Sequence, residues 1–412
     1  MNIAIIDDGL LPIGKFSGRS QKQRLLRRIA SENFDRSREL AKAFAKKHNV
    51  LFITAAESGS LGAGLFEYSG EDGVLSLFVS AEGKNGGFSG EKYFLFEKRL
   101  RQNAAVLAGL FKPDAVIFSS ALPFCFGAGK RLSELSGAVL VSAFPCSYRN
   151  ILRGVVSPAV LMALRLLLRG NSPAESSGAL FGFYPKFCSE ASFGRLVAPP
   201  YPEKPCSPSE KAIAVRDSVA ALSGDGIFTL CYCGELEKDR SLEELIIAAK
   251  GFGKRFSLAL CGEGEYKAAL RRIARENGVT EVFFYDGVPP EDIPFVLSAA
   301  DAAFIGENTF AQGLFCEYGA FLRVLSAKRP VIAAAEENAA FLNECGGVAV
   351  VHTKNSGETA NAVSAIIALP EEKRRLLGAA CGDFAAKHSF NAFAEGFLSA
   401  IDSFVKAKEK QQ

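Results

Sequence analysis

The sequence lacks an imbalance of charge. Its 48 Lys and Arg stand against 45 Asp and Glu, which gives a formal net charge of +3 at pH 7. Long stretches of low hydrophobicity and high charge, the signature of disorder, are missing as well. We therefore expect a globular chain that carries no global electrostatic signal for nucleic acid.

Apolar runs long enough to cross a membrane are also missing. The longest, from Val155 to Leu168, contains Arg165 and falls short of the roughly 20 residues that a spanning helix needs. The first residues, Met1-Asn2-Ile3-Ala4, do not have the form of a signal peptide. These features predict a cytoplasmic protein.

The ten cysteines lack the paired spacing of a zinc site. Cys231 and Cys233 form one close pair, but no second pair follows at zinc-ligand spacing. Scattered cysteines in a long chain favour reduced thiols over a disulfide framework. The three histidines form no constellation, so we expect neither a bound metal nor a catalytic histidine.

What the sequence does contain is an alternation of short apolar runs with amphipathic stretches, which is typical of parallel sheets with crossover helices. Because 412 residues exceed one hydrophobic core, we expect two domains, each doubly wound and Rossmann-like. The predicted strands of the first half are 3–6, 50–54, 74–79, 115–119 and 138–143, with helices at 36–47 and 97–110. Those of the second half are 227–232, 256–261, 281–285, 302–305, 331–334 and 348–351.

The boundary is predicted at "APPYPEKPCSPSE", residues 198–210, since five prolines in thirteen positions favour a stiff linker. The expected division is an N-terminal domain at 1–200, a linker and domain entry at 201–225, a second domain at 226–385, and a helix at 386–412 that crosses back to the first domain. Two such sheets are expected to face each other across a cleft, with ligands outside the strand carboxyl ends.

The stretch "CGELEKDRS", residues 233–241, follows one predicted strand and precedes a predicted helix at 242–250. Ser241-Leu242-Glu243-Glu244 has the form of a capping box, which predicts free amides and a positive helix end beside this turn. Gly262 and Gly264 follow the next strand, where glycine allows close approach of the backbone to a ligand. An ordinary helix-entry loop is the alternative for these glycines.

The ordered set of motifs in the second half resembles a known family. Strand-Gly-x-Leu at 233–236, Gly-x-Gly at 262–264, Val-x-Phe-x-x-Gly-Val-Pro at 282–289, Ala-Ala-Asp at 299–301 and Pro-Val-Ile-Ala at 330–333 follow one another. In this order they resemble the donor-binding domain of family-4 glycosyltransferases with the GT-B fold, over about residues 226–390. Residues 37–54, 110–120 and 138–147 resemble the acceptor domain more loosely.

The resemblance implies transfer of a sugar from a nucleotide-diphosphate donor, without a metal or other cofactor. In the family, an Arg after the first-turn glycine and a Lys five residues later face the diphosphate, and a Glu before Pro-Val holds the ribose. Those positions are Glu235, Arg240 and Arg323 here. The exchange of sign at Glu235 and Arg323 suggests that the two side chains face each other; drift is the alternative.

The donor-binding residues that we predict are Gly234, Glu235, Arg240, Gly262, Gly264, Val288 and Arg323. Glu307, which follows a predicted strand, is the catalytic candidate that would meet the sugar hydroxyls, and Gly14 and Lys15 lie in the acceptor-side loop. A solvated first-turn arginine and a polar loop residue are the alternatives for Arg240 and Glu307.

Three functions are compatible with these residues. The first is a metal-independent hexosyltransferase that acts on a glycan or lipid-linked acceptor in cell-envelope or exopolysaccharide synthesis. The second is a weakened GT-B relative that binds nucleotide, glycan or protein without turnover. A nucleotide-dependent oxidoreductase is disfavoured because Asp7-Asp8-Gly9 stands where Gly-x-Gly-x-x-Gly is needed.

The stretch from Lys15 to Lys47 has eleven basic and three acidic residues. This excess predicts peripheral contact with the inner face of a membrane or with a lipid diphosphate. A solvated helix face is the alternative.

Overall fold

A computed structural model describes residues 1–7, 34–56, 66–80, 89–119, 126–144, 179–182, 207–224, 226–307 and 318–410. The described residues form two compact units. Unit 1 contains those up to residue 182 and those from 391 onward, and unit 2 contains those between 207 and 390. The predicted linker at 198–210 and the acceptor-side residues Gly14 and Lys15 lie largely or wholly outside the described residues.

Unit 1 is built on a seven-stranded sheet in the order β3-β4-β2-β1-β5-β6-β7. All neighbouring strands pair in parallel except β3 and β4, which are antiparallel. The strands are β1 (Asn2–Ile6), β2 (Asn49–Ala55), β3 (Phe66–Glu71), β4 (Val74–Val79), β5 (Ala115–Ser119), β6 (Val139–Phe144) and β7 (Ala179–Gly182).

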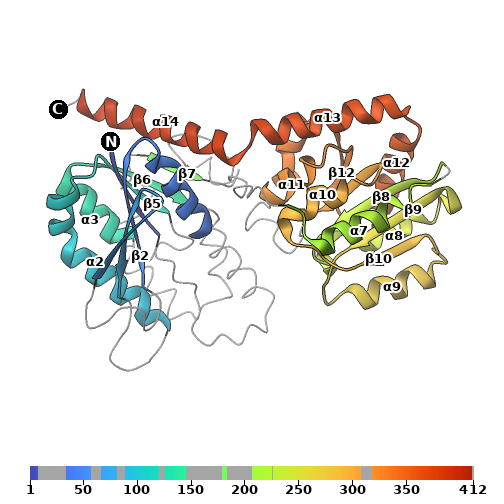
Figure 1. Cartoon of the computed structure of the whole chain (residues 1–412), viewed down its shortest axis with the longest axis horizontal. Coiled ribbons are helices and arrows are strands. Elements are labelled where there is room, and N and C mark those ends of the chain that lie inside the picture. Colours follow the sequence, from blue (N-terminus) through green and yellow to red (C-terminus); the bar gives the residue numbers. More distant parts are fainter. Residues whose placement is uncertain are drawn as a thin grey trace. The chain divides into compact units, whose positions relative to one another are not determined.

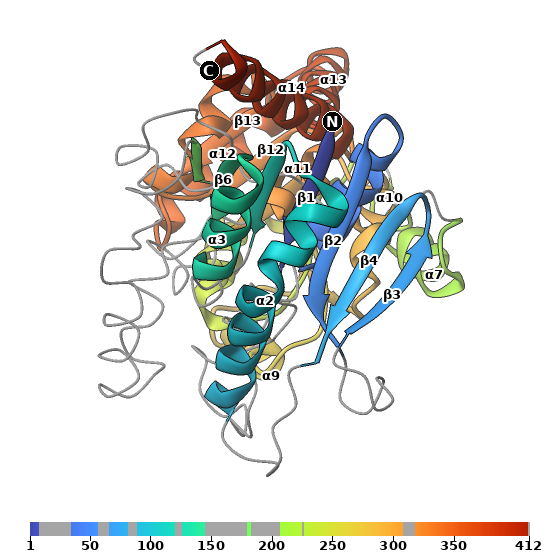
Figure 2. The same ribbon diagram turned by 90° about the vertical axis from the view of Figure 1, so that its left-hand side faces the viewer.

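Helices cover both faces of this sheet. α2 (Ser89–Phe111) and α3 (Phe126–Ser136) pack side by side on one face (Figure 2), where Phe96, Leu100 and Phe126 are fully buried. On the other face, the helix at 34–45 meets α14 (Phe390–Glu409), with the rings of Phe44 and Phe397 6.2 Å apart. Both of those rings are buried, so α14 contributes to the core of unit 1.

Unit 2 has a six-stranded, all-parallel sheet in the order β10-β9-β8-β11-β12-β13. This is the 3-2-1-4-5-6 order of dinucleotide-binding folds, with its switch point between β8 and β11. The strands are β8 (Phe228–Cys233), β9 (Phe256–Cys261), β10 (Val282–Tyr285), β11 (Ala302–Gly306), β12 (Val331–Ala334) and β13 (Val348–Val351). Every residue of β8, β9, β11 and β12 is buried, as expected for parallel strands covered on both faces.

One face of the unit 2 sheet packs against α8 (Leu242–Ala249), α9 (Lys267–Glu276) and α12 (Ser356–Ile367). The helices α7 (Glu210–Ala220), α10 (Ile293–Leu297), α11 (Tyr318–Leu325) and α13 (Glu371–Lys387) pack against one another as a second layer (Figure 1). α7 lies within the stretch expected to be linker, and its N-cap residue, Ser209, donates a hydrogen bond to Asp292 at 2.6 Å.

All eleven predicted strands are present, displaced by at most two residues at either end. Both units are doubly wound, so the predicted α/β class is confirmed. β3 and β7 were not predicted from the sequence. β3 is a polar edge strand that reaches β4 through a tight turn at Asp72 (φ 52°) and Gly73 (φ 77°), and β7 has only four residues.

No helix among the described residues is long and apolar enough to cross a membrane. The five described cysteines, which are Cys231, Cys233, Cys261, Cys345 and Cys381, are buried free thiols.

Candidate active site

The carboxyl ends of β8 and β11 lie side by side in unit 2, because the two strands pair in parallel at the switch point. The turn at 234–241 follows β8, and Glu307 follows β11. Open α/β sheets bind ligands at this place. We call the edge of this sheet where its strands end the carboxyl edge.

The turns that follow β8 and β9 are joined backbone to backbone. The Leu236 N–H donates to the Glu263 carbonyl at 2.9 Å. A Cβ on Gly262 would lie 1.9 Å from the Gly234 carbonyl oxygen, and one on Gly264 would lie 2.2 Å from that of Leu236. Both predicted glycines are therefore needed for the approach of the neighbouring turn, whether or not a ligand also lies there.

Arg240 is buried between the β8 turn and the end of β11. Its Nη1 donates to the Gly306 carbonyl at 3.4 Å, and its own carbonyl oxygen would lie 1.9 Å from a Cβ on Gly306. The carboxylate of Glu235 is 3.6 Å from Nη2, and that of Glu237 is 3.7 Å from Nε. An anion that arrives at this edge therefore competes with two partly exposed carboxylates for one fixed guanidinium.

Ser241 does not cap α8, so the capping-box prediction is wrong. The residue adopts a left-handed conformation (φ 55°, ψ 29°) and its side chain makes no capping hydrogen bond. Its Oγ instead accepts a hydrogen bond from the Lys354 N–H at 3.3 Å. The serine oxygen that was predicted to cap α8 is therefore bonded to a backbone N–H 113 residues away. α8 nevertheless begins at Leu242, as predicted.

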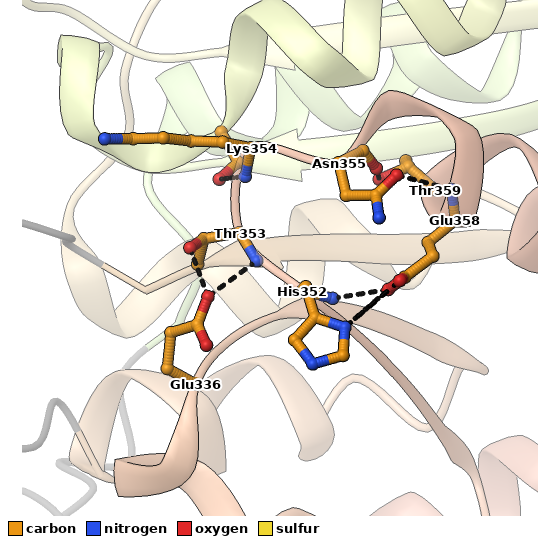
Figure 3. A network of polar contacts seen from close by, with 8 residues as sticks. Glu336, His352, Thr353, Lys354, Asn355, Glu358 and Thr359 are labelled. Carbon is orange, nitrogen blue, oxygen red and sulfur yellow. Dashed lines mark hydrogen bonds and ion pairs between the residues drawn. The ribbon is translucent and has the colours of Figure 1, made fainter.

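Two carboxylates connect the ends of β11, β12 and β13, and Figure 3 shows the contacts of the second, Glu336. Glu307 is buried, and its Oε2 accepts the Glu336 N–H at 3.0 Å. The Glu336 Oε1 accepts the N–H of Thr353 at 3.1 Å and its hydroxyl at 2.5 Å. Glu307 thus positions the neighbouring loop, and its proposed contact with a sugar remains a prediction.

The entry to α12 is held by a second set of bonds. Asn355 caps the helix by accepting the Glu358 N–H, and the Glu358 carboxylate accepts the His352 N–H at 2.9 Å. The same carboxylate hydrogen-bonds to the exposed imidazole and raises the pKa of His352. This region was not predicted from the sequence, although Asn-Ser-Gly-Glu at 355–358 has the capping pattern that marks it.

Another ion-pair cluster lies at the ends of β9 and β10. The Lys267 Nζ is 3.0 Å from the Glu263 carboxylate and 3.8 Å from that of Asp286. The hydrogen bond from Lys267 holds the pKa of Glu263 below its usual value. The partly buried Val288 follows in the same loop.

The carboxyl edge brings together six of the predicted donor residues and the catalytic candidate, namely Gly234, Glu235, Arg240, Gly262, Gly264, Val288 and Glu307. Arg323 lies in the last turn of α11 and is partly buried. Its pairing with Glu235 stays a prediction. No group of three or more His, Cys, Asp or Glu side chains in the described parts of the chain could hold a metal ion.

Comparison with known sequences identifies one matching family. Residues 220–380 match the profile described as Glycosyl transferases group 1, which covers most of unit 2. No curated protein sequence matches the chain.

Solved structures match the whole chain at low identity. HepE from Anabaena in complex with UDP is 14% identical, with a TM-score of 0.63, 98% of this chain and 100% of that chain covered. Sucrose-phosphate synthase from Thermosynechococcus elongatus is 15% identical, with a TM-score of 0.60 and coverages of 98% and 99%. A glycosyltransferase from Rickettsia africae is 11% identical, with a TM-score of 0.57 and coverages of 98% and 99%. The chain therefore has the predicted GT-B fold, and its unit 2 carries the match to glycosyl transferases group 1.

Proposed function

We propose that this protein is a glycosyltransferase that binds a nucleotide-diphosphate sugar at the carboxyl edge of unit 2. The observation that carries the proposal is the match of residues 220–380 to glycosyl transferases group 1, because this segment contains the whole edge. HepE has been solved with UDP-glucose, and a structural neighbour from E. coli with UDP-2-fluoro glucose. UDP is therefore the first nucleotide to test.

The chemistry that the edge would perform is stabilisation of a leaving diphosphate. Negative charge grows on the diphosphate as the glycosidic bond breaks, and a fixed cation in a partly desolvated site stabilises that charge without reorganisation. Arg240 meets this description, since it is buried and held by Gly306. We propose a metal-independent hexosyl transfer in which Arg240 faces the diphosphate.

The acceptor side is proposed from the sequence resemblance. A glycan or lipid-linked acceptor would bind unit 1, and the product would enter cell-envelope or exopolysaccharide synthesis. The basic stretch from Lys15 to Lys47 supports peripheral contact with an anionic lipid surface at the inner face of a membrane.

Replacement of Arg240 tests the donor site. Arg240→Met should weaken UDP binding at least tenfold, because a charge-assisted hydrogen bond contributes about 1.5–3 kcal/mol. Arg240→Lys retains the charge and should retain part of the affinity. Arg272→Met is the control, since that exposed arginine pairs with Glu276 on α9. The measurement is calorimetric titration, with the unfolding midpoint of each variant as a check of folding.

Unchanged UDP affinity in a folded Arg240→Met variant would exclude Arg240 from the site. Absence of any binding by the wild-type protein to UDP, ADP, GDP and dTDP would remove the nucleotide-sugar proposal itself.

Binding without turnover is the second candidate function. It is favoured by Glu235, which places a carboxylate beside Arg240 where the resembling family has a cation. Donor hydrolysis, measured by release of UDP from UDP-glucose and other UDP-sugars, separates the two. Tight binding with no release by the wild type, and release by Glu235→Arg, would favour the binding function.

A further inference from the structure

Every residue of the loop at 352–355 is fixed by a hydrogen bond of its backbone or side chain. His352 bonds to Glu358, Thr353 to Glu336, and Asn355 caps α12. The Lys354 N–H donates to Ser241, which follows Arg240 directly in the chain. The Lys354 side chain is exposed and extends away from this network (Figure 3). The loop thus presents one exposed cation on a hydrogen-bonded backbone, and its Lys354 N–H reaches the residue that follows Arg240.

The two residues joined by this bond are both in the left-handed region. Ser241 has φ 55° and Lys354 has φ 59°. Residues with a Cβ pay a steric cost there, which glycine would avoid. Such strain persists where surrounding contacts impose it, and it gathers at ligand sites. The strained pair lies where the turn that carries Arg240 meets the loop after β13.

The cations of the carboxyl edge differ in whether carboxylates neutralise them. Arg240 is paired with Glu235 and Glu237, and Lys267 is paired with Glu263 and Asp286. Within the described part of this edge, the Lys354 ammonium has no carboxylate within ion-pair distance. A diphosphate that binds beside Arg240 would gain from a second cation that has no carboxylate partner.

We propose that Lys354 binds the diphosphate of the nucleotide donor. Its ammonium would replace the cation that the similar family has at the position of Glu235. The inference rests on the proposed function, because it assigns a further residue to the same site. This cation lies in the loop after β13, whereas the family's cation lies in the turn after β8. A lysine is suited to this role as a point charge on a flexible four-carbon stem.

The test compares UDP with uridine as calorimetric ligands. Lys354→Met should weaken UDP binding about tenfold and leave uridine binding unchanged, since uridine has no phosphate. Lys354→Arg keeps the charge and should bind UDP within about threefold of the wild type. The matched control is Lys250→Met, an exposed lysine at the opposite end of α8.

Lys354→Gly separates charge from backbone, because glycine accepts φ 59° without strain and leaves the loop intact. Weak UDP binding by this variant, equal to that of Lys354→Met, would support the role of the ammonium. Wild-type UDP affinity in a folded Lys354→Gly or Lys354→Met variant would overturn the inference and leave the proposed function standing. Failure of the wild type itself to bind UDP, ADP, GDP or dTDP would remove both.

Discussion

Glu97 is a partly buried carboxyl group in unit 1 whose pKa is shifted by its surroundings. It lies on α2, and its Oε2 accepts the Ala128 N–H in the first turn of α3 at 3.0 Å. Burial raises the pKa of Glu97 to about 7, although the hydrogen bond from Ala128 and the charge of Arg101 oppose the shift. The folded unit therefore binds a proton that the unfolded chain has released near pH 6.

The stability of unit 1 should fall as the pH rises from about 5 to 8. A folded pKa above the unfolded value of 4.5 stabilises the protein below pH 4.5, and that contribution is lost as the pH rises through 7. The loss is at most about 1.4 kcal/mol per pH unit between these values. Glu97→Gln should flatten the profile, as measured by denaturant unfolding at pH 5, 6, 7 and 8. Glu134→Gln, on an exposed position of α3, should keep the wild-type slope; an equal slope in Glu97→Gln would contradict the assignment.

At the residue scale, the sequence predicted where residues lie in the fold better than it predicted their hydrogen-bond partners. Arg240, Gly262 and Gly264 lie at the carboxyl edge as expected, because each lies in a turn that follows a strongly apolar strand. The bond between Ser241 and Lys354 joins residues 113 apart, and no local pattern encodes it. A local sequence pattern predicts that a serine caps the helix that follows it. In the folded chain, an N–H that is distant in sequence can donate to that serine oxygen instead.

At the scale of strands and helices, glycines allow the backbones of neighbouring turns to approach each other closely. Gly262→Ala should destabilise unit 2 by about 2–3 kcal/mol, since the new methyl group overlaps the backbone of Gly234 and the turns must separate. Gly396→Ala is the matched substitution in the interior of α14, where nothing lies within 4 Å of the added Cβ. It should stabilise unit 1 by up to about 1 kcal/mol. Calorimetric unfolding checks both, and equal effects of the two substitutions would contradict the packing argument.

Strands proved more predictable than their edges. Continuous apolar runs such as Phe256–Cys261 can be recognised because both faces of the strand are buried. β3 was not predicted because its sequence, Phe66–Glu71, is not a continuous apolar run. It is an edge strand that pairs with β4 through the turn at Asp72-Gly73. A search for continuous apolar runs does not find a strand with this sequence.

At the scale of the whole molecule, unit 1 is assembled from two distant parts of the chain. α14 adds Phe397 and Ile401, both fully buried, to a core otherwise formed by residues before 182. Lys408 near the end of the helix donates to the carbonyls of Gly137 and Ala138, just before β6. The resemblance to GT-B proteins suggested such a helix, and its contacts with the helix at 34–45 could not be derived from sequence.

Phe397→Ala should therefore destabilise unit 1 by about 3–5 kcal/mol, through loss of buried area and the cavity left beside Phe44. Hydrogen exchange should rise in β1 and in the helix at 34–45, with peptides of the unit 2 sheet unchanged. Leu376→Ala, at an exposed position on α13, serves as the control and should stay within about 0.5 kcal/mol of the wild type. Equal loss of protection in both units would show that they unfold together.

The split composition of unit 1 also sets an order of events during synthesis. Residues 207–390 are translated before α14, which takes on the order of 10–40 s at about 5–20 residues per second. Throughout that interval, Phe44 in the helix at 34–45 lacks the packing partner that α14 later supplies. A ribosome that stalls within unit 2 therefore releases a chain whose first unit exposes apolar surface, which chaperones and proteases recognise.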